Sequence, residues 1–198
     1  MQKKRVAILV SGRGSNMRAL IEAARNPEYP AEIVCVISNR PDAAGLDFAK
    51  AANIVTEVVD HKQYFSREDF DAALHQTLVS HNIDLVCCAG FMRVMTPAIL
   101  DHWRGRMLNI HPSLLPAYKG TNTHERALAD GATRHGASVH FVTPELDSGP
   151  VIAQAAVPVL PNDRAETLAA RVLEVEHPLY VKALALVASG KIHMRTSD

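Results

Sequence analysis

The sequence predicts an α/β fold with a doubly wound, mostly parallel sheet and a late antiparallel edge. Short apolar runs rich in β-branched residues alternate with segments of helical period from residue 5 to residue 110. These runs are apolar at successive positions, as expected for central strands that are covered by helices on both faces. The last two runs, 137–143 and 150–159, are separated by a turn and indicate a hairpin.

The first half of the chain has the pattern of a βαβ series. Strands are expected at 5–10, 31–38, 54–59 and 83–90, and helices at 15–25, 43–52 and 66–81. Ser66, with Asp69 three residues later, has the spacing of a capping box and should open the third helix.

The second half contains more loop. The expected elements are a short helix at 97–104, a strand at 106–110, a helix at 123–130, the hairpin strands and a long last helix. Two prolines and a glycine exclude regular structure from the loop HPSLLPAYKG, residues 111–120. Asp163 and Glu166 have capping-box spacing before the last helix, Pro178 should kink it, and Gly190 should end it.

Composition limits the class of protein. A length of 198 residues predicts one domain over 1–198, and 47% hydrophobic residues suit a globular core. The 21 basic and 21 acidic residues balance, which disfavours bulk binding of nucleic acid, and no apolar stretch is long enough to span a membrane. Cys87 and Cys88 are adjacent on a strand and point to opposite faces, so a disulfide between them is disfavoured and the cytoplasm is the expected compartment.

The segment SGRGSN, residues 11–16, is the first candidate binding motif. Its glycines allow a tight turn, and the free amides at the start of the next helix suit a phosphate. Met17 occupies the place of a third glycine, so NAD binding is only weakly supported. The alternative is a plain βα turn in which Ser15 caps the helix, but the position at the carboxyl end of the first strand favours phosphate.

Asn109 and His111 form the second candidate. A spacing of two places both side chains on one face of an extended segment. The amide could hydrogen-bond a developing oxyanion and the imidazole could move a proton, which suits acyl-type chemistry; strand-end capping is the alternative. Asp147 lies in the later turn beside Gly149 and could orient and charge His111, or could simply form an Asx turn.

Other candidates are weaker. Ser113 lacks the G-x-S-x-G elbow of a serine nucleophile, and the ten histidines show no zinc-binding spacing. The segment 90–95, GFMRVM, mixes apolar side chains with Arg93 and suits either a flat heteroaromatic ligand or core packing with a solvent-facing arginine.

Taken in order, five segments resemble the glycinamide ribonucleotide formyltransferase family: AILVSGRGSN, ISNRPDAAGL, AGFMRVMTP, MLNIHPSLLPAYKG and GASVHFVTPELDSGPVIAQAAVPV. The resemblance covers roughly residues 5–190, and NIHPSLLP followed by HFVTPELDSG is its most specific part. It implies a Rossmann-like fold and transfer of the formyl group of 10-formyltetrahydrofolate, the cosubstrate, to the amine of glycinamide ribonucleotide in purine (IMP) biosynthesis. No metal is implied.

The resemblance also implies roles for individual residues. The catalytic trio falls on Asn109, His111 and Asp147, with Asn109 and His111 at the oxyanion, His111 also moving a proton, as acid or base first, and Asp147 holding that histidine. The nucleotide site falls on Gly14, Ser15, Asn16 and Glu176. The folate cleft falls on Arg67, Met92, Arg93, Val94, Met95, Asn109, Glu145, Leu146 and Asp147. The N-terminal half would thus bind the phosphate, and the C-terminal half would contribute to the folate cleft.

Three alternatives remain within and beyond the family. The formyltetrahydrofolate deformylases hydrolyse the same folate but carry an N-terminal regulatory domain, and the transfer-RNA formyltransferases carry an added basic C-terminal domain; this chain is expected to have neither. A catalytically silent binder of phosphate ligands is the third alternative. The expected partners are small-molecule substrates, with no nucleic acid and no membrane, and both a monomer and a homodimer fit the sequence. Loop 117–124 is a candidate mobile lid.

Overall fold

The computed structural model describes residues 2–195. Its elements are β1 (Lys4–Val10), α1 (Ser15–Ala24), β2 (Ala31–Ser38), α2 (Ala44–Ala51), β3 (Val55–Val58), the 3-10 turn η1 (His61–Gln63), α3 (Arg67–Ser80), β4 (Leu85–Cys88), α4 (Pro97–His102), β5 (Met107–His111), α5 (Thr123–Ala129), β6 (Arg134–Phe141), β7 (Val151–Pro158) and α6 (Ala165–Ala188). Every strand and helix expected from the sequence is present, and η1 is the one short element that the sequence pattern missed.

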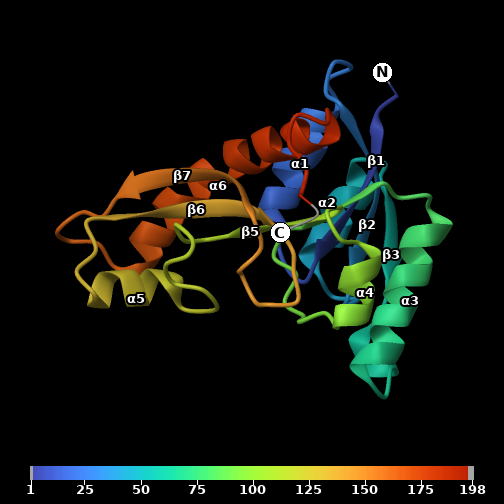
Figure 1. The fold of residues 1–198 in the computed structure, drawn as a ribbon, viewed down its shortest axis with the longest axis horizontal. Coiled ribbons are helices and arrows are strands. Elements are labelled where there is room, and N and C mark those ends of the chain that lie inside the picture. The colour runs from blue at the N-terminus through green and yellow to red at the C-terminus, as the bar shows by residue number, and fades with distance from the viewer. Residues whose placement is uncertain (1, 196–198) are drawn as a thin grey trace.

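The seven strands form one sheet in the order β3-β2-β1-β4-β5-β6-β7 (Figure 1). The pairs from β3 to β5 are parallel, whereas β6 and β7 add an antiparallel edge. The chain winds outward from β1 to β3 and then continues on the other side of β1 with β4, so β1 and β4 flank a topological switch point. Ligands of such sheets bind outside the carboxyl ends of the strands at that point.

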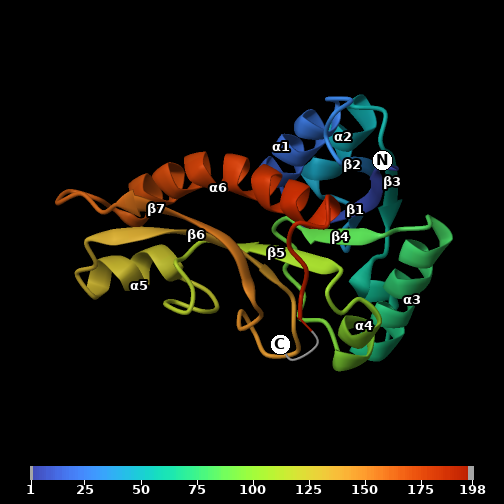
Figure 2. The ribbon, with the colours of Figure 1, turned by 45° about the horizontal axis from the view of Figure 1, so that its top comes forward.

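Helices cover both faces of the sheet because successive strand residues face opposite sides (Figure 2). On β1, Val6 and Ile8 pack in one core cluster with residues of α1, α2 and α6. Ala7 and Leu9 pack in a second cluster with residues of α3 and α4. The continuous apolar strands predicted from the sequence therefore correspond to a sheet that is buried on both sides.

Helix α6 is long and crosses the sheet, with Leu168, Val172 and Leu179 buried beneath it. The predicted capping box of Asp163 and Glu166 is wrong. Arg164 is the N-cap, and its N–H donates to Oγ1 of Thr167, while Asp163 binds that hydroxyl and Arg171. Thr167 stands three residues after the true cap, so the motif is shifted by one position. The helix continues through Pro178, and the kink there stays a prediction.

The end of α6 agrees with expectation, since Gly190 has φ of 71° and follows the C-cap Ser189. The tail residues 196–198 lie outside the described part. The three cysteines are free thiols, as expected. Within residues 2–195, no helix combines the length and the apolar character that crossing a bilayer requires.

The β6–β7 hairpin closes tightly at Gly149. A Cβ at this position would overlap the carbonyl of Phe141, so only glycine lets the second strand approach there. The turn between the strands carries Asp147, whose φ of 48° is left-handed. The hairpin therefore directs the turn back toward the carboxyl end of β5.

Candidate active site

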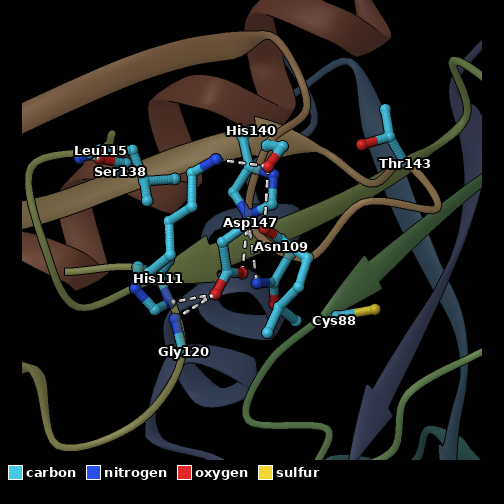
Figure 3. Close-up of polar contacts among 12 residues, drawn as sticks. Cys88, Asn109, His111, Leu115, Gly120, Ser138, His140, Thr143 and Asp147 are labelled. Carbon is cyan, nitrogen blue, oxygen red and sulfur yellow. Dashed lines mark hydrogen bonds and ion pairs between the residues drawn. The ribbon is translucent and has the colours of Figure 1, made fainter. Parts of the chain in front are cut away.

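One strand and one turn bring the predicted catalytic trio together (Figure 3). Asn109 and His111 lie on β5, and Asp147 comes from the turn between β6 and β7. The antiparallel register pairs Asn109 directly with His140 of β6, which adds a second imidazole to the group. The side chains of His111, His140 and Asp147 are each less than one-tenth exposed.

His111 has an acceptor at each ring nitrogen. Its Nε2 lies 2.9 Å from the carbonyl oxygen of Tyr118, and its Nδ1 lies 3.4 Å from Oδ2 of Asp147. A ring that carries protons on both nitrogens would donate to both acceptors. Because the Tyr118 carbonyl occupies Nε2, Nδ1 is the nitrogen that faces the carboxylate.

Asp147 is surrounded by donors. Its Oδ2 accepts the N–H of Gly120 at 2.9 Å, and its Oδ1 lies 3.6 Å from Nε2 of His140 (Figure 3). Burial raises the pKa of Asp147, but the hydrogen bonds from His140 and Gly120 and the nearby charge of His111 lower it more, so the net shift is downward. The carboxylate is therefore held ionised beside the two imidazoles.

His140 is a site residue that the sequence pattern does not single out. Its Nδ1 lies 2.9 Å from the carbonyl of Phe141, and its Nε2 lies 3.3 Å from Nδ2 of Asn109 as well as 3.6 Å from Oδ1 of Asp147. This contact fixes which way the Asn109 amide points. The signal was the cross-strand register of β5 and β6, which the sequence alone does not supply.

The loop from Pro112 to Asn122 folds over this group. Lys119 donates to the hydroxyl of Ser148, and Arg126 donates to the carbonyl of Lys119. Together with the bond from Gly120 to Asp147, these contacts tie the loop to the hairpin turn. Ser113 donates to the carbonyl of Ala117 and is fully buried, which agrees with its rejection as a nucleophile.

A cavity of about 470 Å³ opens at the switch point, and its lining includes Ala89, which follows the Cys88 that pairs with Asn109. It is lined by the SGRGSN turn, by the ends of β2 and β4, by three arginines and by Glu176 of α6; the lining arginines are Arg13, Arg40 and Arg93. Gly14 is the N-cap of α1 in the left-handed conformation, so the alternative in which Ser15 caps the helix is wrong. Gly14, Ser15 and Asn16 present the start of a helix to this basic cavity.

Asn16 and Glu176 meet across the cavity although they are far apart in sequence. Nδ2 of Asn16 donates to Oε2 of Glu176 at 2.6 Å. Oδ1 of Asn16 is buried and has no partner. Burial raises the pKa of Glu176, and the bond from Asn16 only partly opposes this shift. Both side chains therefore retain polar atoms that a ligand could satisfy.

The predicted folate residues lie on three segments around the same edge. Met92 to Met95 form an irregular segment after β4, in which Met92 is 78% and Val94 59% exposed. The N–H of Met92 donates to Ser11, and Arg93 lies 5.2 Å from the ring centroid of Phe70.

The other two segments contribute less to the enclosed space. Arg67 is exposed on the first turn of α3, one turn before Phe70. Glu145, Leu146 and Asp147 form the hairpin turn, and Glu145 also borders a second cavity of about 630 Å³ beside α4. Of the predicted folate set, the cavity at the switch point includes only Met92 and Arg93.

No three His, Cys, Asp or Glu side chains among residues 2–195 are grouped so that they could hold a metal ion.

Comparison with known proteins places this geometry in a family. The family profile described as "Formyl transferase" matches residues 4–184. The chain is 44% identical over 189 residues to the phosphoribosylglycinamide formyltransferase of Escherichia coli (strain K12), covering 96% of this chain and 89% of the relative. It is 49% identical to the human "Trifunctional purine biosynthetic protein adenosine-3" over 98% of this chain but spans only 19% of that protein.

Solved structures agree with these matches. The phosphoribosylglycinamide formyltransferase of Coxiella burnetii has a TM-score of 0.94 and 45% identity, covering 98% of this chain and 92% of that one. The corresponding protein of Brucella melitensis has a TM-score of 0.92 and 48% identity, covering 98% and 100%. The expected fold, a mostly parallel sheet with a late antiparallel edge, is thus confirmed.

Proposed function

The chain belongs to the formyl transferase family, and we propose that it transfers the formyl group of 10-formyltetrahydrofolate to the primary amine of 5-phosphoribosylglycinamide in purine biosynthesis. The observation that carries this proposal is that the Asn109–His111–Asp147 group and a basic cavity at the start of α1 both lie at the carboxyl ends of the parallel strands. One part suits acyl transfer, and the other suits a phosphorylated acceptor.

Asn109 and His111 would stabilise the charge that develops during transfer. As the amine nitrogen bonds to the formyl carbon, negative charge gathers on the formyl oxygen, where the Asn109 amide and the Nδ1 side of His111 can donate hydrogen bonds. His140 holds the amide in that orientation through the contact of its Nε2 with Nδ2 of Asn109. The C–N bond to the folate then breaks and the oxyanion returns to a carbonyl.

His111 would also move the proton. The amine loses one proton when it becomes an amide, and the folate nitrogen gains one when it leaves, so the protons balance without an added reagent. The carbonyl of Tyr118 keeps Nε2 occupied, so the transfer would use Nδ1, the nitrogen that also lies 3.4 Å from Asp147. Asp147 compensates the positive charge that the ring carries between the two steps.

The nucleotide would bind in the basic cavity. The free amides of Gly14, Ser15 and Asn16 at the start of α1 suit the phosphate, with Arg13 adding charge at the same end of the cavity. Glu176 would accept hydrogen bonds from the ribose hydroxyl groups. The unpartnered Oδ1 of Asn16 would accept a hydrogen bond from a further donor of the nucleotide. The acceptor amine would then extend toward Asn109.

The folate would lie along the opposite side. The exposed apolar side chains of Met92 and Val94, with Met95 beside them, suit the flat ring system. The backbone of this segment and the turn Glu145–Asp147 offer the polar contacts, and Arg67 on α3 would pair with a carboxylate of the folate.

In this proposal residues 1–198 act as one domain with small-molecule partners and no metal, in the cytoplasm. The N-terminal half supplies the nucleotide site through α1, and the C-terminal half supplies the catalytic turn and part of the folate cleft.

The decisive experiment follows the absorbance change of 10-formyltetrahydrofolate with purified protein, with and without 5-phosphoribosylglycinamide. Turnover that requires the nucleotide is expected. Turnover without it would show a deformylase-like hydrolase, and ligand binding without turnover in either case would show a non-catalytic phosphate binder. His111→Ala is expected to lower kcat roughly 10³-fold while nucleotide binding by calorimetry stays intact.

A further inference from the structure

Tyr180 of α6 places a hydroxyl group between two strands that lead into the site. The side chain is fully buried. Its hydroxyl oxygen lies 3.0 Å from the carbonyl oxygen of Cys88 on β4 and 3.1 Å from that of Leu108 on β5. The hydroxyl has one proton, which is donated to one of the two carbonyls or shared between them in a bifurcated hydrogen bond. One side chain of a covering helix thus contacts the backbones of two adjacent strands.

Both carbonyls lie where the pairing of β4 and β5 ends. The register of the two strands runs from Val86 with Met107 to Cys88 with Asn109, and β5 continues past the end of β4 to His111, where it is still paired with β6. The Leu108 carbonyl belongs to the same planar peptide unit as the N–H of Asn109, so its orientation sets that of the Asn109 backbone. The Cys88 carbonyl similarly precedes Ala89 and Gly90, which line the nucleotide cavity.

The same face of α6 also contacts the SGRGSN turn, where the nucleotide is proposed to bind. Glu176 precedes Tyr180 by four residues, which places both on one face of α6. Glu176 is bonded to Asn16 of the SGRGSN turn. Helix α6 therefore connects the start of α1 to the end of the β4–β5 ladder through two side chains one turn apart.

We propose that Tyr180 is a positioning residue for formyl transfer, whose hydroxyl group fixes the ends of β4 and β5 and thereby sets where Asn109 stands relative to the nucleotide cavity. This inference rests on the proposed function. The hydroxyl touches no substrate and acts through Asn109. Its loss should leave substrate binding in place and lower the rate of the chemical step, because small displacements of catalytic groups are costly.

The test compares Tyr180→Phe with Tyr29→Phe. Tyr29 donates its hydroxyl to the carbonyl of Val181 at 2.7 Å, so the control removes the same kind of bond from the neighbouring residue of the same helix, away from Asn109. In Tyr180→Phe, kcat should fall roughly 10-fold with each KM within about 2-fold of the parent. Tyr29→Phe should keep the parent kcat, whatever either variant does to the melting temperature.

A double-mutant cycle shows whether the effect passes through Asn109. In an Asn109→Ala background, Tyr180→Phe should lower kcat less than about 2-fold, because the group that the hydroxyl positions is gone. An undiminished 10-fold loss in that background, an equal loss in Tyr29→Phe, or a Tyr180→Phe effect confined to KM would each overturn the proposal.

A second readout is independent of turnover and of thermal stability. The side-chain amide signal of Asn109, assigned by its disappearance in Asn109→Ala, should shift in the NMR spectrum of Tyr180→Phe and stay in place in Tyr29→Phe. An unmoved signal in Tyr180→Phe overturns the proposal. If the parent protein transfers no formyl group, the proposed function fails, and the NMR comparison still decides whether Tyr180 positions Asn109.

Discussion

Two buried carboxylates at the functional edge lie in opposite environments. Asp147, in the hairpin turn, faces the N–H of Gly120 and the rings of His111 and His140, and its pKa lies below the usual range. Glu176, on α6, receives one amide hydrogen bond, and burial holds its pKa above the usual range. The same functional group is thus kept charged on one side of the site and driven toward the neutral form on the other.

This difference indicates that the hairpin turn stabilises charge, whereas the α6 side of the site provides hydrogen bonds. The hairpin side carries a carboxylate beside two imidazoles, which suits proton movement and transition-state charge. The α6 side carries a carboxyl group with polar atoms to spare, which suits the hydroxyl groups of a ligand. We therefore expect changes to Asp147 to act on kcat and changes to Glu176 to act on KM.

The largest effect is expected from Asp147→Asn. The amide keeps the shape of the side chain but loses the charge that compensates His111, so kcat should fall roughly 10³-fold and the pH profile of the residual rate should move. Steady-state kinetics across pH 5 to about 9 measures both. Asp163→Asn, which breaks an ion pair with Arg171 between two side chains that do not line the cavity, serves as the control. A pH profile identical to that of the parent would argue against a charge role for Asp147.

A smaller effect, and one on binding, is expected from Glu176→Ala. Removal of the carboxyl group takes away an acceptor for the nucleotide and leaves the Asn16 amide unpaired, so KM for the nucleotide should rise roughly 10-fold. The kcat at saturating nucleotide should stay within about 2-fold of the parent. A loss of kcat with an unchanged KM would contradict the proposed division between the two sides.

The smallest effect is expected on stability, with opposite signs for the two carboxyl groups. Asp147 has a lowered pKa in the folded state, so its contribution is present above its ordinary pKa and is lost as the pH falls through the folded value. Glu176 has a raised pKa, so its ionisation opposes folding as the pH rises through the folded value.

Thermal melts of the neutral variants separate these two contributions. At pH 7, Glu176→Gln should melt about 2 °C higher than the parent, and the gain should vanish toward pH 4. Asp147→Asn should melt lower than the parent at pH 7, with a deficit that shrinks as the pH falls. Deficits or gains that stay constant over this range would mean that neither pKa shift contributes to folding.

Local patterns were sufficient to predict the fold. Continuous apolar runs such as 5–10 predicted buried parallel strands, and the turn PELDSG predicted the antiparallel hairpin. Ser66 caps α3 as predicted, since its hydroxyl accepts the N–H of Asp69 and donates to the Asp69 carboxylate. The cap of α6 was placed one residue early because Asp163 and Glu166 match the spacing as well as Arg164 and Thr167 do.

The site was predictable only in part, because its members meet through long-range pairing. The spacing of Asn109 and His111 is a local signal, and the structure brings Asp147 to them as the resemblance implied. The place of His140 in the site could be predicted only from the register of β5 with β6. The contact of the Tyr118 carbonyl with His111 depends on the path of an irregular loop, which the sequence does not give. The contact between Asn16 and Glu176 likewise arises from the docking of α6 on α1, for which neither segment carries a sequence signal.

The tight closure at Gly149 has a consequence for how the site is assembled during folding. The β6–β7 hairpin joins residues that are close in the chain, so little entropy is lost when it forms, whereas β1 must find β4 across two intervening strands. Asp147 and His140 therefore belong to a locally formed unit, and Asn109 and His111 belong to the strand at the end of the parallel series. Recovery of activity after dilution from denaturant would consequently report the joining of these two units rather than the formation of either one.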